Sequence, residues 1–297
     1  MVRLKDHLFP TTAEEAVEML SALGGRGRIL AGGTDLVEKL REGDSDIDVF
    51  VDIRRIEDMK SIALKGDHII IGAGVTHAQV ATSDLVKKEA GVLAEACLSV
   101  GGPQIRNLGT LAGNVVSAQP AADGSLALAS LSATLTVLGL TYRHEMDIAN
   151  AFAGPGVSKI DATKEVITEI AVPIKGERRG SNYQRLAMRR SLSLPMVAAA
   201  AVVDLEEKRF KRVRLAVGPM APTPLVVSEI DDLLRGKSVS RRNISKAVEI
   251  LGRVAQPRDS LLRGSRDYRL SMVQVLAYKA VMTASLRAQG IWEERKG

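Results

Sequence analysis

Short apolar segments alternate with polar turns along the first half of the chain, which indicates a fold of short helices and strands. A helix is predicted over residues 12–24, because Thr12 can cap it, Glu15 follows three positions later and a glycine pair ends it. Further helices are predicted from Leu36, after Thr76 and over 93–100, and strands over 28–30, 49–53, 68–71, 135–138 and 166–172. Residues 101–114 are expected to form a long glycine-containing loop.

The pattern changes near residue 175. Residues 174–181 are charged, contain two glycines and show no apolar periodicity, so we predict a domain boundary there, between residues 1–175 and 176–297. Beyond it, strands are expected over 197–203 and 213–217, followed by helices near 226–234, 240–254 and 268–288. The chain lacks the regular alternation of strand and helix that marks a doubly wound fold, so we interpret it as α+β with mixed sheets.

The composition narrows the classes of protein that fit. Hydrophobic residues make up 45% and charged residues 26% of the 297 positions, which excludes wholesale disorder. Aromatic residues are only 3%, so few are available to stack against single-stranded nucleic acid. The single cysteine excludes an internal disulfide framework and an iron–sulfur cluster ligated by cysteines of this chain. Because we find neither an apolar run of about 18 residues nor a signal-type start, we expect a cytoplasmic soluble protein without a membrane span.

The charge is divided unevenly between the two predicted domains. The net charge is +6, but residues 1–175 contain 17 Lys and Arg against 23 Asp and Glu, whereas residues 176–297 contain 24 against 12. A basic half of this kind favours nucleic acid, an acidic protein or an anionic ligand as a partner, although a solvated basic surface explains it equally well. Arg185, Arg189 and Arg190 are candidates for reaching such an anion.

Two glycine loops are the candidate binding elements. The first is Ala31-Gly32-Gly33-Thr34-Asp35, between a predicted strand and a predicted helix, and the second runs from residue 101 to residue 114. Paired glycines allow backbone N–H groups to approach a diphosphate closely, and Thr34, Thr110 and Asn114 offer further donors. Each loop alone is also explained by turn geometry. Together with Asp123, which can accept hydrogen bonds from sugar hydroxyls, they predict a dinucleotide site.

Other catalytic and binding templates fit poorly. The segment Gly72-Ala73-Gly74-Val75-Thr76-His77 fails as a dinucleotide fingerprint at its last position, so we interpret it as a strand end leading into a capped helix. The four histidines are scattered without zinc-type spacing, so no metal site is expected. Cys97 lies in an apolar helical stretch and is predicted to be a buried, unreactive thiol.

The second glycine loop and its surroundings resemble a known family. Residues 102–114, followed by Pro120-Ala121-Ala122-Asp123, resemble the FAD-binding (medium) subunits of the molybdenum hydroxylases, the family of xanthine dehydrogenase and carbon monoxide dehydrogenase. The loop at 31–35 fits the first flavin loop of that family. The segments that resemble its C-terminal domain are Tyr183-Gln184-Arg185-Leu186, Leu215-Ala216-Val217-Gly218, Arg263-Gly264-Ser265 and Tyr268-Arg269. Ala31 to Asp35 and Gly154-Pro155-Gly156 are most similar to bacterial xanthine dehydrogenase-type members.

The resemblance implies an α+β fold in which a two-subdomain FAD-binding domain of the PCMH type precedes a smaller α+β C-terminal domain. The subdomains would span about residues 1–55 and 56–175. The two glycine loops would hold the diphosphate, Asp123 the sugar portion, and Ile167 would lie beside a ring of FAD. Some members place a lysine of the C-terminal domain beside the flavin, and here either Arg185 or Gln184 would take that role. The residues implied to contact FAD are Ala31, Gly32, Gly33, Thr34, Asp35, Leu36, Ile105, Thr110, Ala112, Gly113, Asn114, Asp123, Ile167 and Arg185.

The resemblance also implies partners and an electron route. A large subunit with a molybdenum cofactor (molybdopterin) would hydroxylate the substrate, which we expect to be xanthine, a related N-heterocycle or an aldehyde. Electrons would pass through two-iron two-sulfur clusters of a small subunit to FAD on this chain, and from there to NAD+ or another acceptor. No residue of this chain need act as an acid, base or nucleophile, because the flavin supplies the redox chemistry.

Two other functions remain open from the sequence. A stand-alone FAD-dependent oxidoreductase of the same flavin fold would need a catalytic acid or base near the flavin, and no convincing one is found. A nucleic-acid-binding module would rest on the basic residues 176–297 and predicts salt-dependent binding of DNA or RNA. The FAD-carrying electron-transfer subunit, which binds no nucleic acid, is the interpretation that accounts for both glycine loops and for the segments beyond residue 175.

Overall fold

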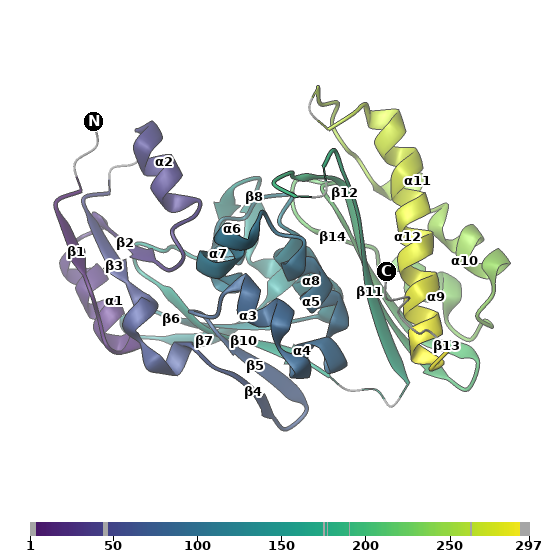
Figure 1. The fold of residues 1–297 in the computed structure, drawn as a ribbon, viewed down its shortest axis with the longest axis horizontal. Helices are drawn as coiled ribbons and strands as arrows, with labels where there is room; N and C mark the ends of the chain where they lie inside the picture. Colours follow the sequence, from purple (N-terminus) through teal and green to yellow (C-terminus); the bar gives the residue numbers. More distant parts are fainter. Residues whose placement is uncertain are drawn as a thin grey trace.

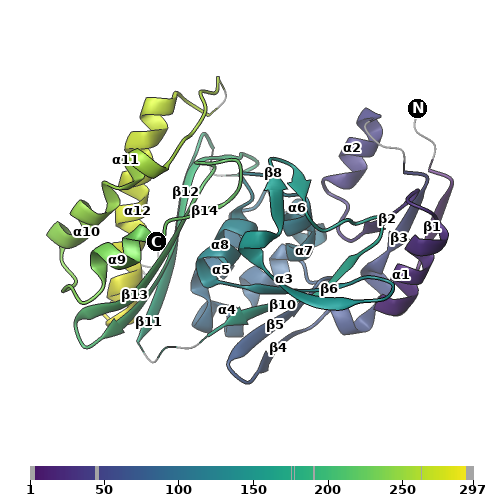
Figure 2. The same cartoon turned by 180° about the vertical axis from the view of Figure 1, so that it is seen from behind.

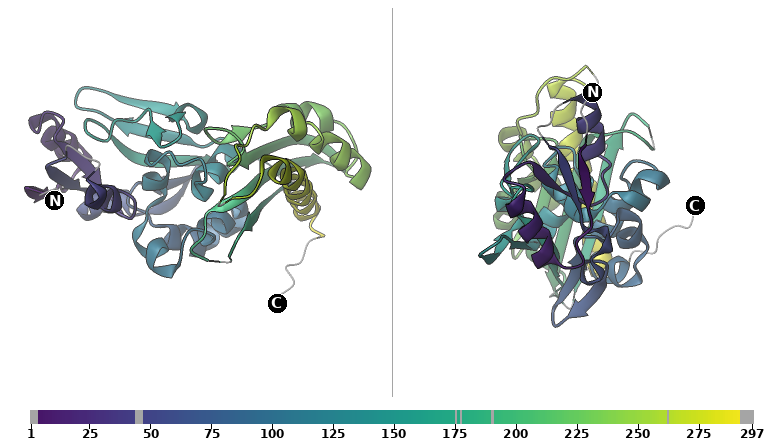
Figure 3. Two further views of the ribbon diagram at one scale, coloured as in Figure 1. Left: turned by 90° about the horizontal axis from the view of Figure 1, so that it is seen from above. Right: turned by 90° about the vertical axis from the view of Figure 1, so that its left-hand side faces the viewer.

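The computed structural model describes residues 4–43, 47–174, 176, 178–189, 191–261 and 263–291. Lys175 and Glu177, at the predicted domain boundary, and Arg190 lie outside the described residues. Three units follow one another along the longest axis in chain order, with the N-terminal strands at one end and helix α12 (Arg266–Ala288) at the other (Figures 1, 2 and 3). Among the described residues, none of the helices combines the length and apolar character that a bilayer span requires.

The first unit is a small parallel sheet with two helices. Its strands are β1 (Asp6–Leu8), β2 (Gly27–Leu30) and β3 (Val49–Asp52), in the order β1-β3-β2, and its helices are α1 (Ala13–Ala22) and α2 (Leu36–Glu42). Thr12 caps α1 as predicted, because its hydroxyl accepts a hydrogen bond of 3.1 Å from the Glu15 N–H. The Glu15 carboxylate accepts from the Thr11 N–H instead of closing a capping box.

The second unit is built on a five-stranded antiparallel sheet. The strand order is β4-β5-β10-β6-β7, so the chain leaves the sheet between β5 and β6 and returns to its middle with β10. The strands are β4 (Ile62–Lys65), β5 (His68–Gly72), β6 (Thr134–Leu138), β7 (Arg143–Asp147) and β10 (Val166–Pro173). A hairpin of β8 (Phe152–Gly154) and β9 (Val157–Ser158) lies outside this sheet.

Six helices connect β5 to β6. They are α3 (His77–Thr82), α4 (Asp84–Glu89), α5 (Gly91–Leu98), α6 (Pro103–Leu108), α7 (Leu111–Val116) and α8 (Asp123–Leu131). The predicted long loop over 101–114 is therefore wrong, because α6 and α7 occupy most of it. Pro103 at the first position of α6 and Thr110 at the cap of α7 are the local signals for these helices. Short 3₁₀ helices occupy Ile53–Arg55, Glu57–Met59 and Ile148–Asn150.

The third unit is a four-stranded antiparallel sheet followed by helices on its outer face. Its strands are β11 (Arg179–Ala187), β12 (Pro195–Glu206), β13 (Arg209–Gly218) and β14 (Leu225–Val226). The helices are α9 (Glu229–Leu234), α10 (Arg241–Val248), α11 (Leu251–Val254) and α12, so the single helix predicted over 240–254 is two helices. The expectation of mixed sheets is also wrong, since each of the named sheets is wholly parallel or wholly antiparallel.

Strand β12 joins the second and third units through its two faces. Most of this strand is alanine and valine, and both of its faces are buried. Ala198, Ala200 and Val202 point into the core shared with the helices of the second unit, whereas Val197 and Ala199 belong to the core under α12. Because side chains alternate along a strand, this single run of small apolar residues fills two cores at once. In Figure 1, β11 and β12 lie between α5 and α8 on one side and α12 on the other.

Candidate functional site

The two glycine loops, far apart in the sequence, line one cleft between the first and second units. Residues that line this glycine-loop cleft lie on β2 and α2 on one side and on α6 and α7 on the other, and Figure 1 shows α2 on the side of the first unit that faces α6 and α7. Ten of the fourteen predicted cofactor-binding residues line it, namely Ala31, Gly32, Gly33, Thr34, Asp35, Leu36, Ile105, Thr110, Gly113 and Asn114. The sequence motifs therefore pointed to residues on both walls of the cleft, although residues 36–100 separate the two loops in the chain.

Direct backbone packing holds the two loops together. A Cβ atom at Gly32 would lie 2.2 Å from the backbone oxygen of Leu108, so only glycine permits this approach. Gly33 follows with a φ of +72°, a left-handed conformation that turns the chain from β2 into α2. On the other side, the Gly109 carbonyl accepts a hydrogen bond of 2.9 Å from the His77 N–H. At Gly32 the missing side chain therefore permits loop-to-loop contact, and close approach of a diphosphate to this backbone stays a prediction.

Hydrogen-bond donors remain available on both walls of the cleft. The backbone N–H groups of residues 32–35 donate to no group within the described part of the chain. On the opposite wall, the Thr110 hydroxyl caps α7 by accepting from the Gly113 N–H at 3.0 Å. The Asn114 side-chain oxygen accepts from the Ser125 N–H at 3.0 Å, which orients the amide of Asn114 and leaves its Nδ2 as a donor. An anion with several oxygens would find neutral donors from two directions.

Two cations also line the cleft, and the sequence analysis missed them. Arg28 lies on β2 just before the first glycine loop, and Lys39 lies on α2 just after it. Arg106, the cation in the second loop, instead donates to the Val100 carbonyl at 3.0 Å and does not line the cleft. A search that included the last strand residues before the loop and the first helical turn after it would have found both cations, because these flank a phosphate-binding turn.

Ala112 and Ile167 line a second, apolar pocket that adjoins the cleft. Besides these two residues, the pocket is lined by Ile29, Ile53 and Val166 among others, and it shares Ala31, Gly113 and Val116 with the cleft. Ile167 lies on β10 and is buried. The donor-rich cleft and the apolar pocket thus form one continuous surface, with a polar part suited to a diphosphate and an apolar part suited to a flat ring.

His77 and Cys97 form a buried contact behind the second glycine loop. His77 lines the cleft, is only 2% exposed, and its Nδ1 lies 3.4 Å from the Cys97 sulfur. Burial, together with the positive charge of Arg106, lowers the pKa of His77 to about 4, so this imidazole is neutral near pH 7. Burial also raises the pKa of Cys97, as predicted for a buried thiol. Thr76 caps α3 in a complete capping box with Gln79, which confirms the interpretation of residues 72–77.

Asp123 and Arg185 come together, but neither lines the glycine-loop cleft. Asp123 begins α8 and accepts hydrogen bonds from Arg185 Nε at 3.1 Å and from the Tyr183 hydroxyl, both on β11. Its side chain is 6% exposed and that of Arg185 is 11% exposed. Burial raises the pKa of Asp123 despite the opposing effect of Arg185 and Tyr183. The contact joins the second and third units, and whether either residue touches FAD stays a prediction.

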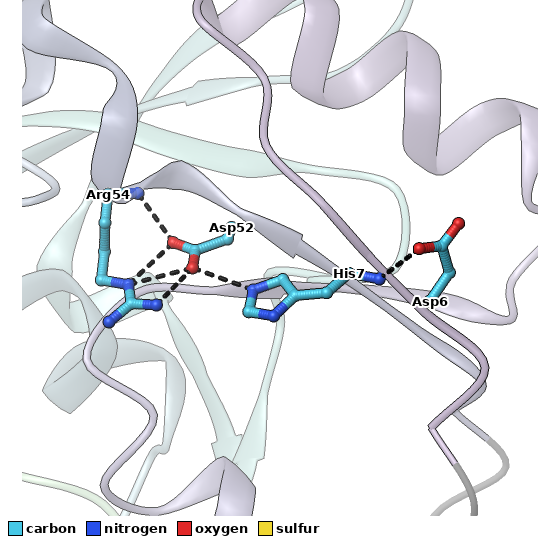
Figure 4. Close-up of polar contacts among 4 residues, drawn as sticks. All are labelled: Asp6, His7, Asp52 and Arg54. Carbon is cyan, nitrogen blue, oxygen red and sulfur yellow. Dashed lines mark hydrogen bonds and ion pairs between the residues drawn. The ribbon is translucent and has the colours of Figure 1, made fainter.

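A second buried carboxylate organises the first unit (Figure 4). Asp52, at the end of β3, accepts hydrogen bonds from the Arg54 guanidinium and N–H and lies 2.9 Å from His7 Nε2 on β1. Burial raises the pKa of Asp52, but the hydrogen bonds from Arg54 and His7 outweigh it, so the pKa lies below its ordinary value. The cluster fixes the turn into Ile53, which lines the apolar pocket.

Two family models match the chain in succession. Residues 4–175 match the FAD-binding domain of molybdopterin dehydrogenases. Residues 182–284 match the C-terminal domain of carbon monoxide dehydrogenase flavoproteins. The first match covers more than half of the chain, and both correspond to parts of one type of subunit.

Relatives of full length show the same relationship. The nicotine 6-hydroxylase medium subunit of Paenarthrobacter nicotinovorans is 28% identical over 94% of this chain and 96% of its own. The xanthine dehydrogenase FAD-binding subunit of Escherichia coli O157:H7 is 26% identical over 94% and 95%. A chain of carbon monoxide dehydrogenase from Hydrogenophaga pseudoflava superposes with a TM-score of 0.91 at 25% identity, covering 97% of this chain and 99% of the other.

These relatives differ in the substrates that their names state, but each aligns with nearly the whole of this chain. The similarity of sequence is nearly equal among them, so it fixes the type of subunit and not the substrate. The two matched domains, the full-length relatives and the superposed fold agree with one another. The chain therefore belongs to the FAD-binding subunits of the molybdenum hydroxylase family, which are oxidoreductase subunits.

Proposed function

We propose that the glycine-loop cleft binds FAD, with its diphosphate between the two loops and one of its rings in the adjoining apolar pocket. The observation that supports this most strongly is the convergence of both loops on one cleft. Free N–H groups at residues 32–35, the Asn114 amide and the cations Arg28 and Lys39 suit a diphosphate. Ile167 and Ala112 suit an uncharged ring. Residues 1–175 would form the FAD-binding domain, and residues 176–297 the C-terminal domain.

The wider role follows from membership of the family. The subunit would accept electrons from iron–sulfur clusters on a small partner subunit, while a large partner subunit with a molybdenum cofactor hydroxylates an N-heterocycle such as xanthine, or an aldehyde. Bound FAD would supply the redox chemistry, because a flavin can exchange single electrons with a cluster and an electron pair with NAD+. The acceptor that we propose is NAD+, which the resemblance to xanthine dehydrogenase-type members implies.

A flavin-retention assay tests the cofactor site. The chain is expressed, mixed with FAD and passed through a gel-filtration column, and its visible spectrum is recorded. We expect a yellow protein with about one FAD per chain. The double substitution Arg28→Glu and Lys39→Glu should lower retention at least tenfold, because each places a carboxylate beside the diphosphate. Arg41→Glu with Lys65→Glu, which makes the same change of charge at exposed positions outside the cleft, should retain the flavin.

The outcomes distinguish the proposal from its alternatives. A colourless wild-type protein that cannot rebind FAD would overturn the cofactor assignment. Equal loss in both double variants would show that net charge, and not the cleft, controls retention. Turnover of a small substrate by the isolated, FAD-loaded chain would favour a stand-alone oxidoreductase, whereas activity that appears only after addition of the molybdenum and iron–sulfur subunits would support the proposed electron-transfer role.

A further inference from the structure

A further cavity lies where the third unit meets the β8–β9 hairpin. We call it the arginine pocket, after Arg258, Arg263 and Arg269, which line it. Much of its remaining wall is formed by the prolines Pro120, Pro155, Pro219, Pro222 and Pro257. The loop between α11 and α12, which bears two of the arginines, lies at the top of Figure 1. The arginine pocket and the glycine-loop cleft have no lining residue in common.

Arg269 provides a buried positive charge on the pocket wall. It is 4% exposed and lies on the first turns of α12. Its guanidinium donates to three carbonyl oxygens, those of Met196 at 3.1 Å, Arg258 at 2.7 Å and Pro219. It forms no ion pair with a carboxylate in the described part of the chain. These carbonyls fix the guanidinium but do not neutralise it, and two of its five N–H groups remain unused.

The two other arginines add to this charge instead of offsetting it. The side chains of Arg258 and Arg263 have neither a hydrogen bond nor an ion pair with another described residue. Burial lowers the pKa of Arg269, and the positive charges of Arg263 and Arg258 lower it further. Asp259 is the one carboxylate on the described wall, and its Oδ1 accepts from the Arg266 N–H at 2.7 Å. The pocket thus has an excess of two positive charges.

We propose that the arginine pocket binds the dianionic phosphate group of a small phosphorylated organic molecule. A phosphate dianion matches the excess charge, and its three terminal oxygens can each accept from a guanidinium, a geometry in which arginine is favoured. The prolines have no N–H to donate, so they form rigid apolar walls for the organic part of the ligand. The charges meet in one hollow rather than along a strip, which favours a compact ligand over an acidic peptide.

This inference is independent of the proposed flavin site. Pro120, which lines the arginine pocket, follows Ser117, which lines the glycine-loop cleft, by three residues, yet the two cavities are lined by different sets of residues. The sequence motif Arg263-Gly264-Ser265 with Tyr268-Arg269 has no part in the glycine-loop cleft, and the arginine pocket gives its two arginines a role.

Calorimetric titration of the full chain, preloaded with FAD, tests the arginine pocket. The probes are phenyl phosphate, inorganic phosphate and phenol at low salt. We expect phenyl phosphate to bind more tightly than inorganic phosphate, and phenol not to bind. The substitutions Arg258→Gln and Arg263→Gln together should weaken phenyl phosphate binding at least tenfold. Arg241→Gln with Arg242→Gln, which removes the same charge from exposed positions on α10, should change it less than twofold.

Three results would overturn the inference. The first is absence of phosphate binding by the wild-type chain, and the second is an equal loss of affinity in both double variants. The third is tighter, Arg258-dependent and Arg263-dependent binding of an Asp- and Glu-rich peptide, which would make the pocket a docking site for protein. If the chain fails to retain FAD, the same titration is run on the apo form. Its result still reports on the arginine pocket, so failure of the flavin proposal is distinguishable.

Discussion

Asp52 is a buried acid whose charge is balanced within the first unit. Its side chain is 1% exposed and contacts Arg54 and His7, so its removal leaves those groups without their partner. We expect Asp52→Asn to lower the free energy of unfolding by about 2–4 kcal/mol at pH 7. Asp58→Asn, at an exposed position in the same region, should change it by less than about 0.5 kcal/mol.

The pH dependence of that difference follows from the lowered pKa of Asp52. Because the folded-state pKa lies below the unfolded value of about 3.9, the stabilisation is complete above that value and is lost as the pH falls through the folded-state pKa. Urea unfolding of the wild type and of Asp52→Asn at pH 7 and at pH 3 measures the difference in free energy of unfolding between the two proteins. A difference that is as large at pH 3 as at pH 7 would contradict a role for the ionised carboxylate.

The pair Asp123 and Arg185 is the second residue-scale case, and its members are predicted to depend on each other. Asp123→Asn or Arg185→Met alone leaves a buried polar partner and should cost about 3 kcal/mol of stability. The double variant should cost less than the sum by about 1–3 kcal/mol. Lys164 and Asp161, an exposed pair 3.2 Å apart, provide the control, because their substitutions should be additive. Additivity at Asp123 and Arg185 would rule out direct coupling.

At the scale of elements, Gly32 determines how the two glycine loops pack. A Cβ atom at Gly32 would lie 2.2 Å from the Leu108 carbonyl oxygen, which belongs to the backbone and cannot rotate away. Gly32→Ala should therefore separate the loops, lower stability by about 1–3 kcal/mol and reduce flavin retention. At Gly154 nothing lies within 4 Å of an added Cβ, so Gly154→Ala should leave both unchanged. Full flavin retention in Gly32→Ala would contradict this account of the cleft.

The elements also show how far sequence reasoning reached. Strands such as β10 and β12 and the long helix α12 were predicted, because their apolar residues recur with a clear period. Helices α6 and α7 were missed because each has only six residues and follows glycines that read as loop. Strand β11 was missed for two reasons. It begins inside the charged segment 174–181, which was interpreted as a domain boundary. In addition, polar residues such as Asn182 are buried in it by contacts with distant residues, which the local sequence does not reveal.

The same limit applies to the site. The sequence identified the glycine loops through motifs that are local in the chain. It missed Arg28 and Lys39, which flank the first glycine loop, and His77, whose position in the cleft depends on how separate elements pack. Asp123 and Arg185 were both expected at the cofactor, which stays a prediction, but their ion pair across 62 positions of sequence was not foreseen. Long-range pairing of this kind has no local pattern from which it could be predicted.

At the scale of the whole molecule, the basic half of the chain is only partly a surface. Arg179 pairs with Asp204 at 2.7 Å, with side chains 15% and 14% exposed, and it also donates to the Pro173 carbonyl at the end of β10. Arg185 and Arg287 are likewise held by Asp123 and Glu95 of the second unit. Part of the positive charge beyond residue 175 therefore attaches the third unit to the second, and only the exposed remainder is free to attract partners.

This division of the charge predicts that neighbouring arginines behave differently. Arg179→Gln should lower the thermal unfolding temperature, at a cost of about 2 kcal/mol, because it breaks a largely buried pair. Arg178→Gln with Arg189→Gln should leave that temperature unchanged, since both side chains are exposed and donate only to backbone carbonyls. In the assembled complex, the exposed double variant should instead slow reduction of the flavin by NADH, the reduced form of the proposed acceptor, several-fold at low salt and not at high salt, because long-range attraction is screened. Thermal unfolding and rapid-mixing kinetics at two salt concentrations measure both effects, and identical kinetics at low salt would show that the exposed arginines attract neither the acceptor nor a partner.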